Sequence, residues 1–244
     1  MRVIEPIWAT KTETASRLRG RIESVLDWST TRGYRQGENP ARWRGHLENL
    51  LPKRSKVRGV VHHAALPFGQ VGAFVKKLRA ENGTAARALE FLILTAARTN
   101  EVIGAVWNEI DLDQATWTIP AARMKGGRLH RVPLSPAAVT VLEQMKKNRT
   151  SEFVFPGLKA KAPLSNMAML ALLKRIDRDD LTAHGFRSTF RDWVAEQTTH
   201  PAELAEMALA HVISNKVEAA YTRLRRSSAT DDCPGSEFYE PRYP

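Results

Sequence analysis

Six side chains in five short segments are of the types needed to act on a phosphodiester. They are Arg98, Lys125, His184, Arg187, His211 and Tyr221. A guanidinium group stays charged at any working pH and can hydrogen-bond two phosphate oxygens at once. Arg98 and Arg187 therefore suit a clamp that stabilises the negative charge gathered on a phosphate under attack.

Tyr221 is the candidate nucleophile of this set. A tyrosine hydroxyl of ordinary pKa, near 10, is only about 0.1% ionised at pH 7. It needs a proton acceptor and positive charge nearby, which His184 and the arginines can supply. His184 and Arg187 are three residues apart, on one face of an expected helix start. This pattern predicts attack by a tyrosine on a phosphodiester.

The order of these residues resembles that of the tyrosine site-specific recombinases, and within them the prophage integrases. That family's signature is an Arg, a hairpin Lys, a His-x-x-Arg, a second His and a nucleophilic Tyr. The matching segments are Thr95-Ala-Ala-Arg98-Thr-Asn-Glu101, Lys125, Ala183-His184-Gly-Phe-Arg187, Leu209-Ala-His211 and Ala219-Ala-Tyr221. With similar segments upstream at 12–21 and 38–41, the resemblance covers roughly residues 10–225.

The resemblance implies a DNA-cutting and DNA-joining enzyme that forms a covalent 3′-phosphotyrosine on Tyr221. By the same analogy Lys125 protonates the leaving 5′-oxygen, His211 donates a hydrogen bond to the phosphate, and Glu101 orients Arg98 or His184. A phosphotyrosine retains the energy of the broken bond, so a DNA 5′-hydroxyl reseals the strand without ATP. The sequence has neither a phosphate-binding nucleotide loop nor a tight acidic cluster for two metals. We therefore expect no cofactor and no metal.

The charge of the chain points to DNA as the partner. Lys and Arg number 37 against 26 Asp and Glu, which gives a net charge of +11. Residues 1–62 hold 13 basic and 6 acidic side chains, a net of +7. Basic side chains placed on phosphates release condensed counterions, which favours a polyanion. The DNA-binding candidates are Arg17, Arg19, Arg21, Arg32, Lys53, Arg54, Lys56 and Arg58.

The elements that must position these residues are mostly helices. Apolar periodicity, with caps and breakers, predicts helices at 12–34, 40–51, 68–79, 84–97, 100–107, 136–147, 165–177, 183–197, 201–210 and 215–226. Short β-prone runs at 115–119 and 129–134 flank Lys125-Gly126-Gly127, a turn signal. The expected fold is mainly α with a small antiparallel β-sheet, an α+β arrangement like the integrase catalytic domain.

Four parts follow from this pattern. Residues 1–52 are expected to form a partial helical DNA-clamping domain, 53–66 a basic linker, 67–226 the catalytic domain and 227–244 an irregular tail. The tail has one basic and four acidic residues, where the family usually has an Arg-rich docking helix. With its shortened clamp, the chain is expected to cleave DNA but to recombine poorly. On DNA, self-association, as a tetramer in the synaptic complex, is expected.

Other functions remain open at this stage. Taken singly, Arg98 could cap a helix, His184 and His211 could lie at helix ends, and Tyr221 could be a packing aromatic. A non-catalytic DNA-binding remnant is one alternative. A type IB topoisomerase-like enzyme, which shares the chemistry, is another.

Several other classes of protein are disfavoured. No run approaches the 18 or more apolar residues of a membrane-spanning helix, and the first residues lack the apolar stretch of a signal peptide. The single cysteine, Cys233, cannot form a disulfide framework or a cysteine-built zinc site. A cytoplasmic location is the natural expectation.

Overall fold

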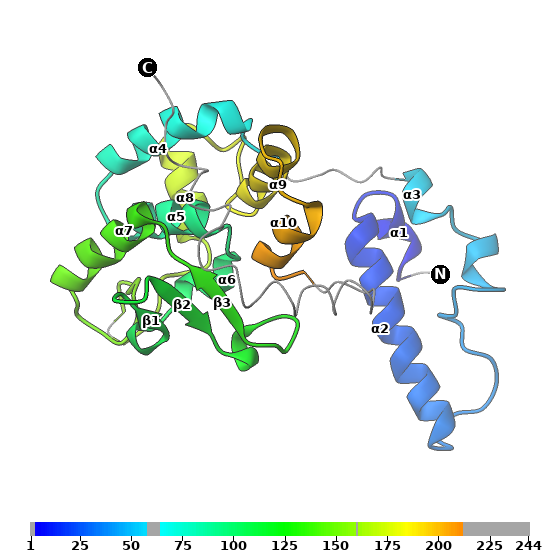
Figure 1. Ribbon diagram of the computed structural model, residues 1–244. Helices are drawn as coiled ribbons and strands as arrows, with labels where there is room; N and C mark the ends of the chain where they lie inside the picture. The colour runs from blue at the N-terminus through cyan, green and yellow to red at the C-terminus, as the bar shows by residue number, and fades with distance from the viewer. Residues whose placement is uncertain (1–2, 58–63, 160, 212–244) are drawn as a thin grey trace. The chain divides into compact units, whose positions relative to one another are not determined.

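The computed structural model describes residues 3–57, 64–159 and 161–211. The chain divides into two compact units, Met1–His62 and His63–Pro244. The mainly helical fold with one small antiparallel sheet is confirmed (Figure 1). No helix among the described residues is long and apolar enough to cross a membrane.

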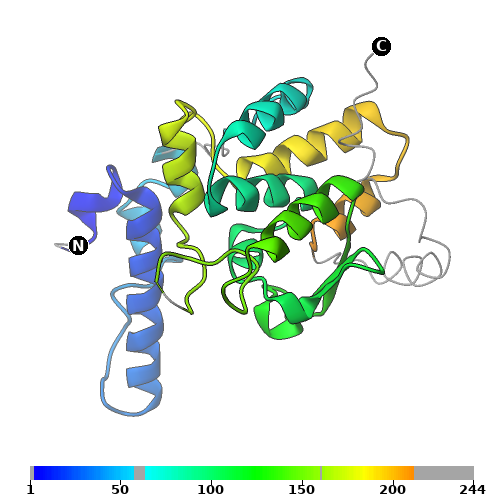
Figure 2. The ribbon, with the colours of Figure 1, turned by 90° about the vertical axis from the view of Figure 1, so that its left-hand side faces the viewer.

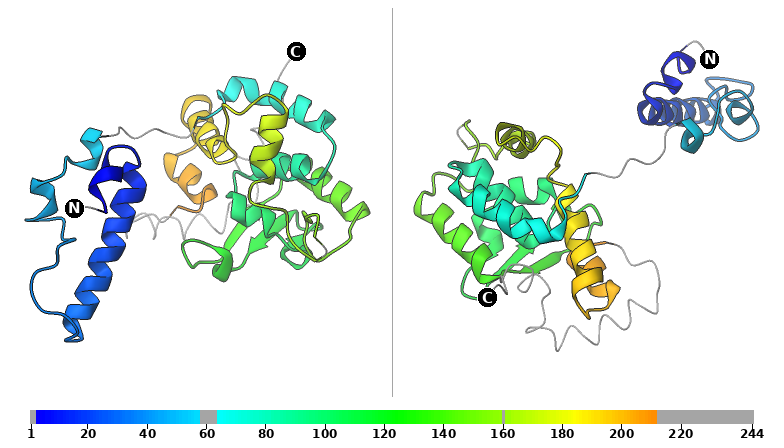
Figure 3. Two further views of the ribbon diagram at one scale, coloured as in Figure 1. Left: turned by 180° about the vertical axis from the view of Figure 1, so that it is seen from behind. Right: turned by 90° about the horizontal axis from the view of Figure 1, so that it is seen from above.

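The first unit is built on one long helix. It contains α1 (Glu5–Trp8), α2 (Thr12–Thr31), a 3-10 turn at Leu47–Asn49 and α3 (Arg54–Val57). Helix α2 is much the longest of these elements (Figure 3). It ends at Thr31, three residues before the expected end at residue 34, and Gly33 follows with a φ of +75°, a left-handed conformation that suits glycine.

The expected helix at 40–51 is wrong. Only Leu47–Asn49 are helical there, and Gly45, with φ +71°, breaks the run. Contacts to α1 and α2 hold the rest of the segment. The Asn39 side chain donates to the Glu23 carbonyl at 2.9 Å, and Trp43 stacks on Trp8 at 5.4 Å between ring centroids.

The expected linker also begins too early at residue 53. Val57 packs against the small core of the first unit, formed by Ile4, Trp8, Ala15 and Leu51. The Trp8 indole donates to the Pro52 carbonyl at 2.9 Å. Residues 53–57 therefore belong to the first unit.

The second unit surrounds helix α5 (Thr84–Thr95), whose residues from Ala88 to Thr95 are all buried. Around it lie α4 (Val71–Ala80), α6 (Thr99–Ile103), α7 (Pro136–Lys147) and α8 (Ala168–Arg175). Figure 2 shows α4 on one side of α5, with α7 and the sheet on the other. Helices α9 (Gly185–Gln197) and α10 (Ala202–Ala208) pack against each other. A helix buried on most of its surface suits the centre of such a domain.

The sheet has the order β1-β2-β3, all antiparallel, with strands Ile110–Asp111, Thr116–Ile119 and His130–Pro133. Trp117 of β2 is fully buried and lies 5.3 Å from Phe91 of α5, measured between ring centroids. This contact fixes the sheet on the central helix. The hairpin that carries Lys125 is thereby held beside the end of α5.

A further helix prediction differs from the structure. The expected helix at 100–107 ends at Ile103, because Val106 forms a β-bridge with Phe153 instead. The helix at 136–147 has the bounds that the sequence indicated, since Ser135 caps it and Pro136 starts it. The expected last helix, at 215–226, lies outside the described residues.

Gly185, the first residue of α9, lies close to the backbone of Ala64, and a substitution can test how tightly the two are packed. A Cβ added there would lie 2.1 Å from the carbonyl oxygen of Ala64. We expect Gly185→Ala to destabilise the second unit by about 1–3 kcal/mol, the usual range for overpacking. Gly72→Ala, in α4, is the matched control, because a Cβ there meets nothing within 4 Å. Thermal unfolding of the full chain measures both. Equal unfolding temperatures for the two variants would contradict this reading.

Candidate active site

A sharp corner after α5 places Arg98. Ala96 ends the helix in a left-handed conformation, with φ +48°, and Arg98 then becomes the N-cap of α6. The buried carboxylate of Glu101 accepts hydrogen bonds from the backbone N–H and the Nη1 of Arg98, each at 2.8 Å. Arg98 therefore starts a new helix, rather than capping the end of the apolar one, and Glu101 fixes the direction of its side chain.

Arg187 lies one turn into α9, with His184 as the N-cap of that helix. Only 5% of Arg187 is exposed. Its Nη1 donates to the Ala96 carbonyl, and its Nη2 donates to the Leu209 carbonyl at 2.7 Å. Burial, together with the charge of Arg98, lowers the pKa of Arg187 to about 10. The group is still protonated at neutral pH, so it remains a cation inside the protein.

Both arginines meet at the end of α10. The Nη2 of Arg98 donates to the carbonyls of Leu209 and Ala210, each at 3.3 Å, and Leu209 is also the acceptor for Arg187. These carbonyls lack partners within the helix and lie at the negative end of its dipole. Two guanidinium groups from distant parts of the chain are thus directed at one oxygen atom.

His211 follows directly and contacts the same group. Its Nδ1 lies against the Glu206 carboxylate, and its Nε2 is 3.3 Å from the Nη2 of Arg187. A carboxylate needs a proton from Nδ1, while an arginine nitrogen can only donate. The neutral imidazole with its proton on Nδ1 satisfies both contacts.

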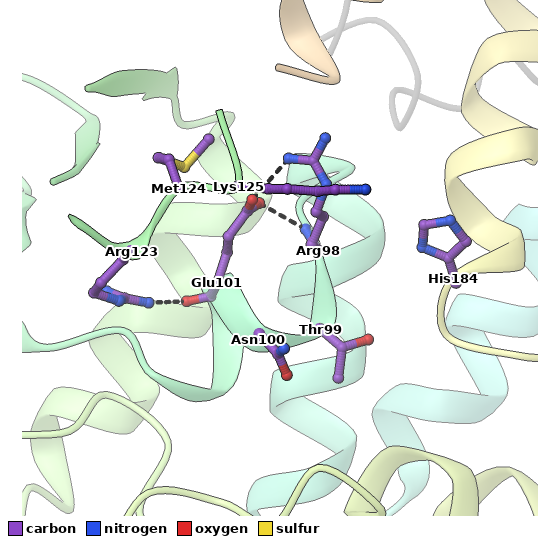
Figure 4. Close-up of a pocket in the computed structure, with 8 residues that line it drawn as sticks. All are labelled: Arg98, Thr99, Asn100, Glu101, Arg123, Met124, Lys125 and His184. Carbon is purple, nitrogen blue, oxygen red and sulfur yellow. Dashed lines mark hydrogen bonds and ion pairs between the residues drawn. The ribbon is translucent and has the colours of Figure 1, made fainter. Parts of the chain in front are cut away.

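Lys125 and His184 lie on an open pocket of about 460 Å³ that Arg98 and Glu101 also line. Lys125 projects into it from the turn between β2 and β3, and His184 faces it from the start of α9 (Figure 4). Lys125 and His184 are both exposed residues. The pocket therefore gathers a lysine, an arginine and a histidine from three separate segments.

Five of the six candidate residues thus come together. Arg98, Lys125 and His184 share the pocket, and Arg187 and His211 join Arg98 at the end of α10. Tyr221 lies outside the described residues. Within the described ranges, no group of three or more His, Cys, Asp or Glu could hold a metal ion.

The sequence analysis missed three residues of this region. Arg123 lines the pocket and pairs with Glu109, while Glu206 contacts His211. His130 of β3 lies close enough to Arg98, Arg187 and Glu101 for their charges to shift its pKa. A signal was present for His130, because it shares a strand face with the buried Val132.

The DNA-binding candidates in the first unit differ in their exposure and in their contacts. Arg17 and Arg54 both pair with Glu13, and Arg21, Arg32, Lys53 and Lys56 are exposed. Arg19 is different, because only 15% of its side chain is exposed and it bonds to Glu23 and the Ala41 carbonyl. Arg19 thus holds the first unit together. Arg58 lies outside the described residues.

Comparison with protein families gives two matches. The model of the phage integrase family matches residues 66–227, more than half of the chain, and that of the phage integrase central domain matches residues 1–46. Prophage integrase IntZ of Escherichia coli (strain K12) is 36% identical over 231 residues, covering 91% of this chain and 55% of the relative. The integrase of Enterobacteria phage P4 is 30% identical, covering 86% and 51%. The chain spans about half the length of these two relatives.

Solved structures give the same fold. A lambda integrase tetramer bound to a Holliday junction has a TM-score of 0.63 at 15% identity, covering 86% of this chain and 62% of that one. The Tn1549 transposon integrase, in complex with a circular intermediate DNA, has a TM-score of 0.58 at 12% identity, covering 86% and 79%. The match to the phage integrase family includes all the helices and strands described in the second unit. These findings identify the chain as a member of the phage integrase family of tyrosine recombinases.

Proposed function

We propose that this chain cuts and rejoins double-stranded DNA in site-specific recombination, through a covalent 3′-phosphotyrosine on Tyr221. The observation that carries the proposal is the convergence of Arg98 and Arg187 on the Leu209 carbonyl. Groups that donate to one oxygen can also donate to the non-bridging oxygens of one phosphate. The relatives named prophage integrases support the reaction class.

In the proposed reaction the two arginines bind the phosphate to be attacked. The Tyr221 oxygen forms a bond to phosphorus while the bond from phosphorus to the DNA 5′-oxygen breaks. Positive charge fixed in advance at this place stabilises the charge that develops on the non-bridging oxygens. The phosphate replaces the α10 carbonyls as the acceptor for at least one guanidinium.

Protons move at two places in this scheme. His184, on the pocket rim, accepts the proton of the Tyr221 hydroxyl, and Lys125, on the hairpin, gives one to the leaving 5′-oxygen. His211 donates to the phosphate from Nε2 once that nitrogen carries a proton. Religation runs the same steps backward, with a 5′-hydroxyl as the nucleophile. None of these steps calls for a metal or a nucleotide.

The first unit is proposed to contact the DNA backbone. Its exposed basic residues, Arg21, Arg32, Lys53 and Lys56, are the best candidates, together with Arg17 and Arg54 beside Glu13. Full recombination needs two DNA sites and four protomers held together, and we propose that assembly on attachment-type sites. A type IB topoisomerase-like activity would need only one site.

The nucleophile is tested by Tyr221→Phe, which removes only the hydroxyl. The full chain is incubated with a pool of nicked suicide duplexes whose sequence around the nick is random. We expect a denaturation-resistant protein–DNA adduct with the unchanged chain and none with Tyr221→Phe. Tyr239→Phe, from the same C-terminal segment, is the matched control and should leave the adduct intact. A folded chain that binds DNA without forming any adduct would favour the non-catalytic remnant.

The proposed contacts with the DNA backbone are tested by the dependence of DNA affinity on salt concentration. Six phosphate contacts would give a slope of roughly −5 in a plot of log affinity against log salt concentration. Arg21→Gln should make the slope shallower by about 1 without unfolding the first unit. Arg19→Gln should lower the stability of that unit instead, because Arg19 bonds within it. An affinity that does not change between low and physiological salt would rule out the backbone contacts.

A further inference from the structure

The C-terminal end of α10 brings Glu206 and His211 side by side. Ala210 takes a left-handed conformation, with φ +49°, directly after the helix, and the chain turns back there. The backbone N–H of Ala210 donates to the Met207 carbonyl at 2.9 Å, and the backbone N–H of His211 reaches the Glu206 carbonyl, also at 2.9 Å. This pair of bonds is the Schellman arrangement, a common end of helices. The turn therefore places the His211 ring next to the Glu206 side chain.

The His211 ring contacts a different group with each of its nitrogens. Its Nδ1 donates to the Glu206 carboxylate, with 2.5 Å between Nδ1 and Oε2. Its Nε2 lies 3.3 Å from the Nη2 of Arg187, the nitrogen that also donates to the Leu209 carbonyl. Arg98 donates to that same carbonyl. Glu206 therefore holds one edge of the ring, while the other edge faces the two arginines.

The second oxygen of the Glu206 carboxylate lies near α9. Its Oε1 is 3.4 Å from the Nε of Arg191, whose side chain is 65% exposed. An ion pair of this length and exposure contributes little to stability. The contact of Glu206 with His211 is much the shorter of the two, so the ring is the main partner of this carboxylate.

The proton on Nδ1 decides which nitrogen of His211 can meet a phosphate. A histidine whose Nδ1–H is held by an acceptor keeps its lone pair on Nε2. This lone pair must take up a proton from solvent before Nε2 can donate to a phosphate oxygen. The resulting imidazolium has a carboxylate on one side and the phosphate on the other, and it lies at the negative end of the α10 dipole.

We infer that Glu206 is a positioning residue for His211. Its carboxylate holds the proton on Nδ1, directs Nε2 toward the two arginines and stabilises the imidazolium that donates to the phosphate. The inference rests on the proposed function, which gives His211 that donation. Glu206 itself touches neither the phosphate nor the attacking oxygen in this scheme.

The tautomer is tested by nitrogen NMR of the free full chain with ¹⁵N-labelled histidines. The His211 signals are identified by their loss in His211→Gln. In the neutral ring of the unchanged chain we expect the proton on Nδ1 and none on Nε2. Glu206→Ala should shift the ring toward the form protonated on Nε2, whereas Glu206→Gln, whose amide oxygen still accepts, should keep the proton on Nδ1. A neutral ring protonated on Nε2 in the unchanged chain would overturn the inference.

The effect on the reaction is tested with the nicked suicide duplexes. Glu206→Ala should slow adduct formation by about 10- to 100-fold, the range for carboxylates that orient metal-bound histidines. Glu206→Gln should slow it less, because the amide keeps the orientation of the ring and loses only the charge. In a chain that already carries His211→Ala, Glu206→Ala should cause no further slowing, since the contact is already gone. The same loss in both backgrounds would show that Glu206 acts on another group, and would rule out the positioning role.

Two variants serve as controls. Glu203→Ala removes an exposed carboxylate from the same helix and should change neither the tautomer nor the rate of adduct formation. Arg191→Ala removes the longer ion pair of Glu206 and should leave the proton of His211 on Nδ1. The two tests also fail separately. Absence of any adduct from the unchanged chain, with the NMR results as expected, would refute the proposed function alone.

Discussion

A buried positive charge organises the second unit. The Arg187 guanidinium is 5% exposed, and an unpaired charge at such a place would be strongly unfavourable. It is compensated by the carbonyls of Ala96 and Leu209, which are the C-cap residues of α5 and α10. Two helices thus direct the negative ends of their dipoles at one cation. The corner after α5, the position of α9 and the end of α10 all follow from this requirement.

Arg98 differs from Arg187 in its exposure and in the length of its hydrogen bonds. It is more exposed than Arg187, lines the open pocket and is anchored by the buried Glu101. Its contacts with Leu209 and Ala210 are long, at 3.3 Å, whereas Arg187 bonds to Leu209 at 2.7 Å. In the proposed reaction Arg98 therefore exchanges its carbonyl partners for a phosphate, while Arg187 supplies fixed positive charge. Contacts within the protein thus fix the direction of both guanidinium groups.

Residue types and their order singled out five described residues that the structure brings together, while the contacts between them had to come from the fold. Helix α7 was predictable to its bounds because Ser135 and Pro136 are strong local start signals. The helix expected at 40–51 failed because the stacking of Trp43 on Trp8 and the bonds of Asn39 outweigh local propensity. His130 went unnoticed because only the fold brings it near the charges of Arg98, Arg187 and Glu101, which act on its pKa. Its alternation with Val132 marks an inward position but does not reveal what lies opposite.

The most direct test of the account replaces one non-bridging oxygen of the scissile phosphate by a methyl group, which removes its negative charge. A preorganised donor that stabilises developing charge is worth roughly 10²- to 10³-fold in rate on a charged phosphate. Arg98→Ala should lose about that much adduct formation on ordinary suicide DNA, and much less on the neutral methylphosphonate DNA. The same loss on both substrates would show that Arg98 does not act on the phosphate charge, and would contradict the central claim.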